Sequence, residues 1–492
     1  MIRLTTTLPA LLAFAAAATA QTDAPATPLG YLIGLVGETK TASPALAALR
    51  GTEDKALTPV FEAMTRSSDK KRRLFGVVAL AELVGKDSAA ALRERLAQDP
   101  VMAIRAESLG RLIEMQAVAP EQIADALKVP DENVQCLAAR ALVARGQVNL
   151  ALGALEKLAG SSDSSTAALA QSCLLGLGRR EHLPSLRKVM RDPETPPVLL
   201  GALLRQIERQ KITAALPLCL HVAGTEEHSM NLRVQAYKVA AAVSSLGAAT
   251  LRDAIARSKR DAFRVRLLKV LASRDDAGRH LGQLADGQGA VPALARFELA
   301  RKVPGPTAAK AVTAAVALEH PVVIAYLLDR ADEDIKAHGK ACDYYVPGFV
   351  QLIRSANPRA KRMQKEHFLA AGAASRLIEL GTPAAVAGLK ELLAGKADAV
   401  TRATAAGLLR ARNAAAGELV RPLLASPYAE LSTDAALALG HFGDPAARPR
   451  LAEILANRQR HPPALVVLAS WYLVKIAGQS RPAAAQLAKA VK

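Results

Sequence analysis

The stretch that decides the fold runs from Gly443 to Leu455, with the sequence GDPAARPRLAEIL, and it follows an apolar segment from Leu431 to Leu439. In that preceding segment, apolar residues recur at spacings of three and four, as in a helix with one buried face. Gly443 suits the left-handed residue that closes such a helix, and Asp444 before Pro445 suits the start of a second one. The stretch therefore predicts two helices joined by a tight turn.

The same hairpin pattern recurs along the chain. Successive copies are separated by 61, 32, 69, 134, 62 and 35 residues, close to whole multiples of one period of roughly 31 to 35 residues. The glycines that mark the copies are Gly85, Gly146, Gly178, Gly247, Gly381, Gly443 and Gly478. The sequence shows no convincing strand alternation. We therefore expect an all-α fold, an α-solenoid (superhelix) of about a dozen helical hairpins.

These copies resemble HEAT repeats, in particular the short bacterial HEAT-like type that also occurs in phycocyanobilin lyases. The resemblance covers most of the mature chain, and Gly443 to Leu455 is its best copy. It implies a solenoid used mostly as a protein-binding scaffold, with lyase activity confined to a subset of the family. No lyase-specific residue could be matched in this sequence.

Composition agrees with stacked hairpins and excludes several other classes. The 492 residues are 51% hydrophobic but only 3% aromatic, and 64 Lys and Arg against 45 Asp and Glu give a net charge of +19. The apolar content excludes intrinsic disorder, and four cysteines are too few for a disulfide-built scaffold. The positive charge attracts anionic partners. A nucleic acid partner is not expected, because aromatic stacking platforms are scarce.

The N-terminus has the form of a secretory signal peptide. One positive charge at Arg3 is followed by an uncharged apolar stretch, and small residues precede a cleavage site expected after Ala20. The alternative is an uncleaved membrane anchor. We predict a signal peptide over residues 1–20, a linker over 21–43 and the solenoid over 44–492, with an irregular stretch at about 305–380 and no transmembrane segment in the mature chain. The protein would then be periplasmic or extracellular.

The irregular stretch gathers tyrosines from a chain with few aromatic residues, and a basic run follows a turn signal within it. The alternative interpretation is a longer loop with aromatic residues packed beneath it and a solvated basic face. The candidate partner-binding residues are Tyr344, Tyr345, Arg359, Lys361, Arg362 and Lys365. No motif indicates a catalytic residue, a cofactor site or a metal site. Asp334, His338 and Cys342, spaced by four residues, form only a weak metal-ligand pattern.

The four cysteines are Cys136, Cys173, Cys219 and Cys342. Because stacked repeats contact only their neighbours, Cys342 should have no disulfide partner. We expect buried free thiols, and Cys173 with Cys219 is the pairing that the repeat geometry disfavours least.

Taken together, the period, the signal and the charge predict an exported non-catalytic scaffold. It would bind a protein or other anionic partner on the concave face of the solenoid. Two alternatives stay open: an enzyme of the lyase type or another enzyme built on HEAT-like repeats, and an envelope protein that docks on anionic lipid or glycan.

Overall fold

The computed structural model describes residues 27–37, 42–244, 247–274, 277–355, 365–395, 398–411, 413 and 415–491. Within these ranges every regular element is a helix, and successive helices pack as antiparallel hairpins on their neighbours. The predicted all-α solenoid is therefore confirmed. The chain divides into two compact units: unit 1 combines Met1–Val118 with Leu408–Lys492, and unit 2 is Ala119–Gly407.

The turns show why the repeat phrase folds as it does. Gly443 closes α26 (Ala429–Phe442) in the left-handed conformation at φ 77°, and the Asp444 side chain accepts a hydrogen bond from the backbone N of Ala446 at 2.9 Å. A positive φ also occurs at Gly85, Gly146, Gly178, Gly381 and Gly478. Gly247 is different, since it opens α15 (Gly247–Arg257). Its glycine is needed for space, because a Cβ there would meet the Ala241 carbonyl oxygen at 2.3 Å.

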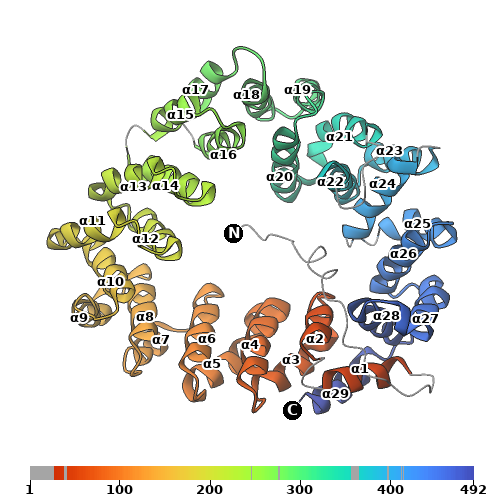
Figure 1. Cartoon of the computed structure of the whole chain (residues 1–492), viewed down its shortest axis with the longest axis horizontal. Helices are drawn as coiled ribbons and strands as arrows, with labels where there is room; N and C mark the ends of the chain where they lie inside the picture. The colour runs from red at the N-terminus through yellow and green to blue at the C-terminus, as the bar shows by residue number, and fades with distance from the viewer. Residues whose placement is uncertain are drawn as a thin grey trace. The chain divides into compact units, whose positions relative to one another are not determined.

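Unit 1 is built from both ends of the chain. Its helices are α1 (Pro28–Gly37), α2 (Ala42–Arg50), α3 (Thr58–Thr65), α4 (Lys70–Val84), α5 (Ala89–Gln98), α6 (Met102–Glu114), α25 (Ala416–Val420), α26, α27 (Arg448–Ala456), α28 (Pro463–Ile476) and α29 (Ser480–Ala490). Helices α1 and α2 pack on α28, and α29 packs on α1 and α3, so the first and last helices are in contact (Figure 1). Stacking between sequence neighbours alone does not predict this contact.

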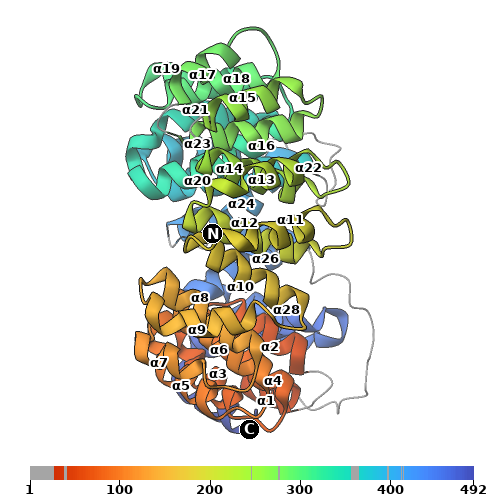
Figure 2. The ribbon, with the colours of Figure 1, turned by 90° about the vertical axis from the view of Figure 1, so that its left-hand side faces the viewer.

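Unit 2 contains α7 (Pro120–Ala126), α8 (Glu132–Ala144), α9 (Val148–Leu158), α10 (Ser164–Gly176), α11 (Leu183–Arg191), α12 (Pro197–Gln210), α13 (Leu216–Gly224), α14 (Met230–Val243), α15, α16 (Asp261–Ala272), α17 (Ala277–Leu284), α18 (Ala290–Ala300), α19 (Pro306–Val316), α20 (Pro321–His338), α21 (Val346–Arg354), α22 (Lys365–Leu380), α23 (Pro383–Ala394) and α24 (Asp398–Arg410). The even-numbered helices contact one another in sequence from α8 to α16 and on to α20 and α22. Figure 2 shows the hairpins from α8 to α16 stacked one above the other.

Unit 2 is curved, and helices α8, α10, α12, α14, α16, α20 and α22 lie on the inner side of the curve (Figure 1). We call the helices α8, α10, α12, α14 and α16 the inner layer. The core between the layers is made of small and branched side chains; around α12 it includes Leu200, Leu203, Leu204, Ile207 and Leu218. Such residues fill the space between helices that approach closely, so few aromatic side chains are needed.

Two stretches differ from the sequence-based expectation. Residues 28–37, placed in the predicted linker, form α1, because Leu32 and Val36 have an apolar face to bury against the C-terminal helices. In the stretch 305–380, the described residues form α19, the 18-residue helix α20, the 3-10 turn η6 (Gly339–Tyr345), α21 and α22. The irregularity of the sequence there reflects this long helix and the turn after it. The predicted signal peptide, residues 1–20, lies outside the described residues.

The thiol prediction is confirmed: all four cysteines are buried and free. Among the helices that the structure describes, none is both long enough and apolar enough to cross a membrane.

Candidate functional site

A network of charged side chains lies between α18 and α20. Glu298 is only 2% exposed, and its two carboxylate oxygens accept hydrogen bonds from Arg330 Nε at 2.7 Å and Arg301 Nε at 2.6 Å. Arg301 also donates to buried Asp334, from Nη1 to Oδ1 at 2.7 Å. Two guanidinium groups thus face two carboxylates, and this balance is what allows the charges to lie in the core.

Three tyrosines complete the network. Tyr344 and Tyr345 both donate their hydroxyls to Asp334 Oδ2, at 2.8 and 2.9 Å, while Tyr326 donates to Glu298 Oε1 at 2.5 Å. Burial, and then the neighbouring acidic groups, raises the pKa of Tyr345 well above its ordinary value. These phenols therefore stay protonated and act as hydrogen-bond donors that hold η6 against α20.

The structure places the two predicted partner-binding tyrosines in the core. Tyr345 has no exposed surface, and its ring stacks on Phe349 with centroids 5.2 Å apart. In this structure Tyr345 has no surface with which to contact a partner, and its ring packs in the core as the alternative interpretation of the stretch expects. Tyr344 is 7% exposed and reaches the surface only at one edge, where partner binding stays a prediction.

The weak metal-ligand pattern is not brought together. Helix α20 ends at His338, so Cys342 lies in η6, and Asp334 is already engaged by Arg301 and two tyrosines. Burial raises the pKa of the Cys342 thiol to about 11, which keeps it protonated at neutral pH. In the described ranges no group of three or more His, Cys, Asp or Glu side chains is arranged to hold a metal ion.

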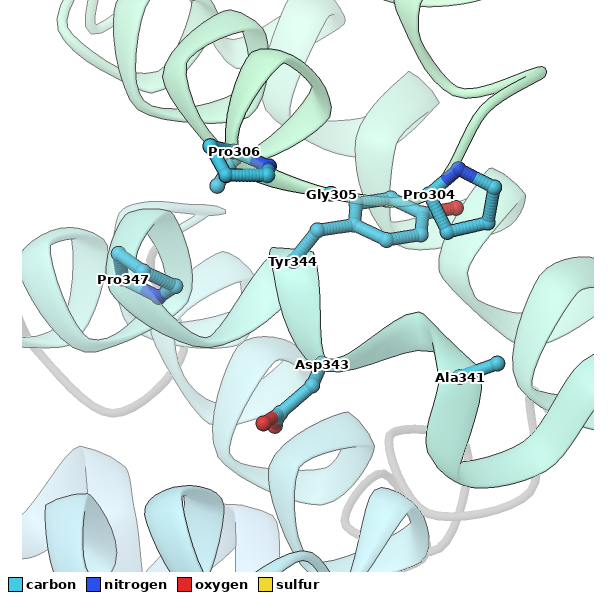
Figure 3. Close-up of a pocket in the computed structure, with 8 residues that line it drawn as sticks. Pro304, Gly305, Pro306, Ala341, Asp343, Tyr344 and Pro347 are labelled. Carbon is cyan, nitrogen blue, oxygen red and sulfur yellow. The ribbon is translucent and has the colours of Figure 1, made fainter.

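A small hollow of about 300 Å³ lies where the turn before α19 meets η6. Figure 3 shows the Tyr344 ring alongside Pro304 and Gly305, with Pro306 and Pro347 on the same hollow. Asp343 points away from these residues, toward α23, where its Oδ1 accepts from Thr382 Oγ1 at 2.5 Å (Figure 3). The hollow thus offers rigid apolar rings and no free carboxylate.

A larger groove of about 730 Å³ runs between α18 and α19. Its floor is mostly apolar, with Leu299, Ala314 and Leu318 among its lining, and Arg296 and Lys310 stand at its sides. Arg296 Nη1 donates to the carbonyls of Ala285 and Gly287, just after α17, at 2.8 and 3.1 Å, whereas Lys310 is exposed. The groove can accept an apolar side chain beside a negative charge.

The structure describes only the end of the predicted basic run. Arg359, Lys361 and Arg362 lie outside the described residues, and Lys365 begins α22. Whether this run binds a partner therefore stays a prediction.

A second basic surface, which the sequence analysis did not single out, lies on the inner layer. Helices α12, α14 and α16 together carry seven basic and two acidic residues. Arg205, Arg209, Lys238 and Arg266 among them are exposed. The signal was present in the sequence as Arg205 and Arg209, four residues apart in a helix whose first eight residues are apolar, but only the stacking shows that these helices adjoin.

Comparisons with known proteins give structural similarities only. No family model and no curated protein matches the chain. Among solved structures it is similar to the karyopherin Kap121p bound to the SUMO protease Ulp1p, with 13% identity over 93% of this chain and 54% of that chain, and a TM-score of 0.32. Kap121p bound to RanGTP matches with 12% identity over 94% of this chain and 52% of that chain, at a TM-score of 0.29.

An engineered protein matches with 17% identity over 88% of this chain and 98% of that chain, at a TM-score of 0.23. The chain spans about half the length of the karyopherin chains that it matches. These TM-scores are low, so nothing that Kap121p binds is carried over to this chain.

Proposed function

We propose that this protein is an exported, non-catalytic scaffold of HEAT-like hairpins that binds an anionic partner, in the first place a protein, on the inner layer of unit 2. The basic excess on α12, α14 and α16 is the observation that carries the proposal. Three adjacent helices with seven basic and two acidic residues create a positive surface that attracts and orients a negatively charged partner.

The buried network supports a structural role for the chain's internal polar groups. Its carboxylates are each held by at least two donors, and the thiol beside it is protonated at neutral pH. Groups that are fully engaged in this way stabilise a scaffold and leave binding to the surface.

Export is supported by the sequence of residues 1–20. N-terminal sequencing of the chain recovered from its native cells tests it directly. We expect a mature N-terminus at Gln21 in the periplasmic or extracellular fraction. A chain that retains Met1 in the cytoplasmic fraction would rule out this part of the proposal.

The inner layer can be tested by charge reversal with a matched control. The double variant Lys238→Glu/Arg266→Glu reverses two exposed charges on the inner layer, and Arg187→Glu/Arg191→Glu reverses two exposed charges on α11, in the other layer. Each purified chain is used to capture proteins from a cell-envelope extract at low and high salt, followed by mass spectrometry.

We expect a protein that the unaltered chain retains at high salt, that the α11 variant also retains, and that the inner-layer variant loses. If both variants lose the captured protein to the same extent, net charge alone binds the partner. Retention of lipid or glycan without any protein would favour the envelope-docking alternative instead.

A further inference from the structure

The side chain of Arg140 reaches from α8 across α10 to α12. Its Nε and Nη2 atoms both donate to Oε1 of the buried Gln206 on α12, each at 3.3 Å. The buried thiols of Cys136 and Cys173 lie beside it, and Cys136 shares a hydrogen bond with it. Arg140 is therefore fixed at one point on the inner layer, where three helices meet.

This guanidinium is not neutralised. In the described part of the chain no ion pair joins Arg140 to a carboxylate, whereas buried Arg73 pairs with Asp99 at 2.8 Å. Burial lowers the pKa of Arg140, and the like charges of Arg209 and Arg205 lower it further. A partly buried cation among like charges costs stability until an anion reaches it.

Arg205 and Arg209 carry two further positive charges near Arg140. Both are exposed on α12, and a spacing of four residues puts their backbones about 6 Å apart along one face of the helix. The only acidic residue of α12, Glu208, is engaged by Lys238 of α14 at 3.0 Å. The two arginines thus have no carboxylate of their own helix available.

The same face of α12 continues as apolar surface. Val198 and Ala202 precede Arg205 and Arg209 at spacings of four, three and four residues, so all four positions form one stripe. Val198 is 82% exposed, more than any other large apolar side chain among the described residues. The stripe is about 16 Å long, which matches about five residues of extended peptide.

We propose that this stripe, together with Arg140, binds an acidic segment of a partner protein in extended form. In an extended chain every second side chain points the same way, with a repeat of about 6.6 Å, close to the spacing of Arg205 and Arg209. Carboxylates of the segment then pair with these guanidiniums and with Arg140, and an apolar side chain covers Val198. This inference rests on the proposed scaffold function and specifies its partner's chemistry.

The test uses the full mature chain and a short fluorescein-labelled peptide with one leucine followed by glutamate at every second position. Fluorescence anisotropy measures binding of this peptide and of a counterpart with glutamine in place of glutamate. We expect only the acidic peptide to bind. The variant Arg205→Gln/Arg209→Gln should weaken it by about tenfold or more, since charge-assisted hydrogen bonds are lost.

The matched control is Arg187→Gln/Arg191→Gln on α11, with the same spacing, exposure and charge change. It should leave peptide affinity nearly unchanged. Arg140→Gln gives a further signature: it should weaken peptide binding while raising the thermal midpoint of the free chain, because it removes an unneutralised charge. If Arg140 had only a structural role, Arg140→Gln would lower the thermal midpoint and leave the affinity for the peptide unchanged.

Three results would overturn the inference: no binding of the acidic peptide, equal weakening by the α11 control, or binding of inorganic polyphosphate or phosphatidylglycerol vesicles through these arginines without peptide binding. Failure here is distinguishable from failure of the scaffold proposal. If capture of a protein still depends on Lys238 and Arg266 while the peptide does not bind, the scaffold stands and the α12 stripe is not its docking site.

Discussion

The contact between the two ends of the chain centres on one carboxylate. Trp471 of α28, the only tryptophan in the sequence, is fully buried and donates from Nε1 to Asp54 Oδ2 at 3.1 Å. The other oxygen, Oδ1, accepts from the backbone N of Ala56 at 3.0 Å, where it caps the short turn η2 (Lys55–Leu57). Lys475 Nζ lies 3.6 Å from Oδ2. Asp54 therefore ties the N-terminal hairpins to α28.

Replacing this residue, Asp54→Ala, should destabilise unit 1 by about 2 to 4 kcal/mol. Loss of the cap costs about 1 kcal/mol, and a buried indole N–H left without a partner costs about 1 to 3 kcal/mol. The ion pair with Lys475 is partly exposed and adds little. Asp54→Asn keeps an acceptor for only one of the two donors, because its amide nitrogen cannot accept a hydrogen bond, and it should lose an intermediate part of this free energy.

Urea unfolding monitored by tryptophan fluorescence is the assay, because Trp471 reports the contact itself. We expect the emission of Asp54→Ala to shift to the red and its transition to move to lower urea. The matched control is Asp444→Ala, which removes an equivalent cap, on Ala446 N at 2.9 Å, elsewhere in unit 1. It should lower stability without shifting the emission. An unchanged emission in Asp54→Ala, or an equal shift in the control, would refute the reasoning.

Three further predictions concern unit 2 and the thiols. Glu298→Leu should cost about 3 to 5 kcal/mol, because buried Arg330 then keeps only the half-exposed Glu333 as an ion-pair partner and Arg301 also loses a carboxylate, whereas Glu298→Leu/Arg330→Met should cost far less; chemical denaturation of the set checks this. Burial, and then the charge of Asp332, raises the pKa of Glu379 in the folded chain. Ionisation of Glu379 therefore opposes folding once the pH rises above the ordinary pKa of a glutamate. Glu379→Gln should raise the thermal midpoint at pH 7 and leave it unchanged near pH 4. Because burial raises the cysteine pKa values, to about 12 at Cys219, a thiol reagent at pH 8 should label none of the four cysteines in the native chain and all four after unfolding.

The hairpin architecture could be read from the sequence because its signals are local. A glycine that closes a helix and a capping residue before proline lie within a few positions of each other, and Gly443 with Asp444 behaves as predicted. The free cysteines followed from the same regularity. What the sequence could not show is which distant helices meet, and the contact of Asp54 with Trp471 joins residues 417 positions apart.

The candidate site shows the same difference between local signals, which the sequence contains, and contacts between distant residues, which it does not show. Tyr344 and Tyr345 drew notice because aromatic residues are rare in this chain, yet rarity does not distinguish a binding residue from a core residue. Their hydroxyls are buried because Asp334 lies within hydrogen-bond distance of both, and that depends on how η6 folds back on α20. For Arg205 the limit is the reverse, because the role that we propose for it depends on the neighbouring helices rather than on its own sequence context.

The two charged clusters of unit 2 differ in a way that separates stability from binding. Around Glu298, guanidinium and carboxylate groups are matched within the protein, so the cluster gains nothing from an added ion. Around Arg140, the charges of Arg205 and Arg209 repel its guanidinium and no carboxylate of the described residues pairs with it, so an incoming carboxylate would relieve repulsion as well as form new bonds. An anionic partner should therefore stabilise the chain more through the second cluster than surface ion pairs ordinarily do, and this difference is why we place the proposed partner on the inner layer rather than at the tyrosine network.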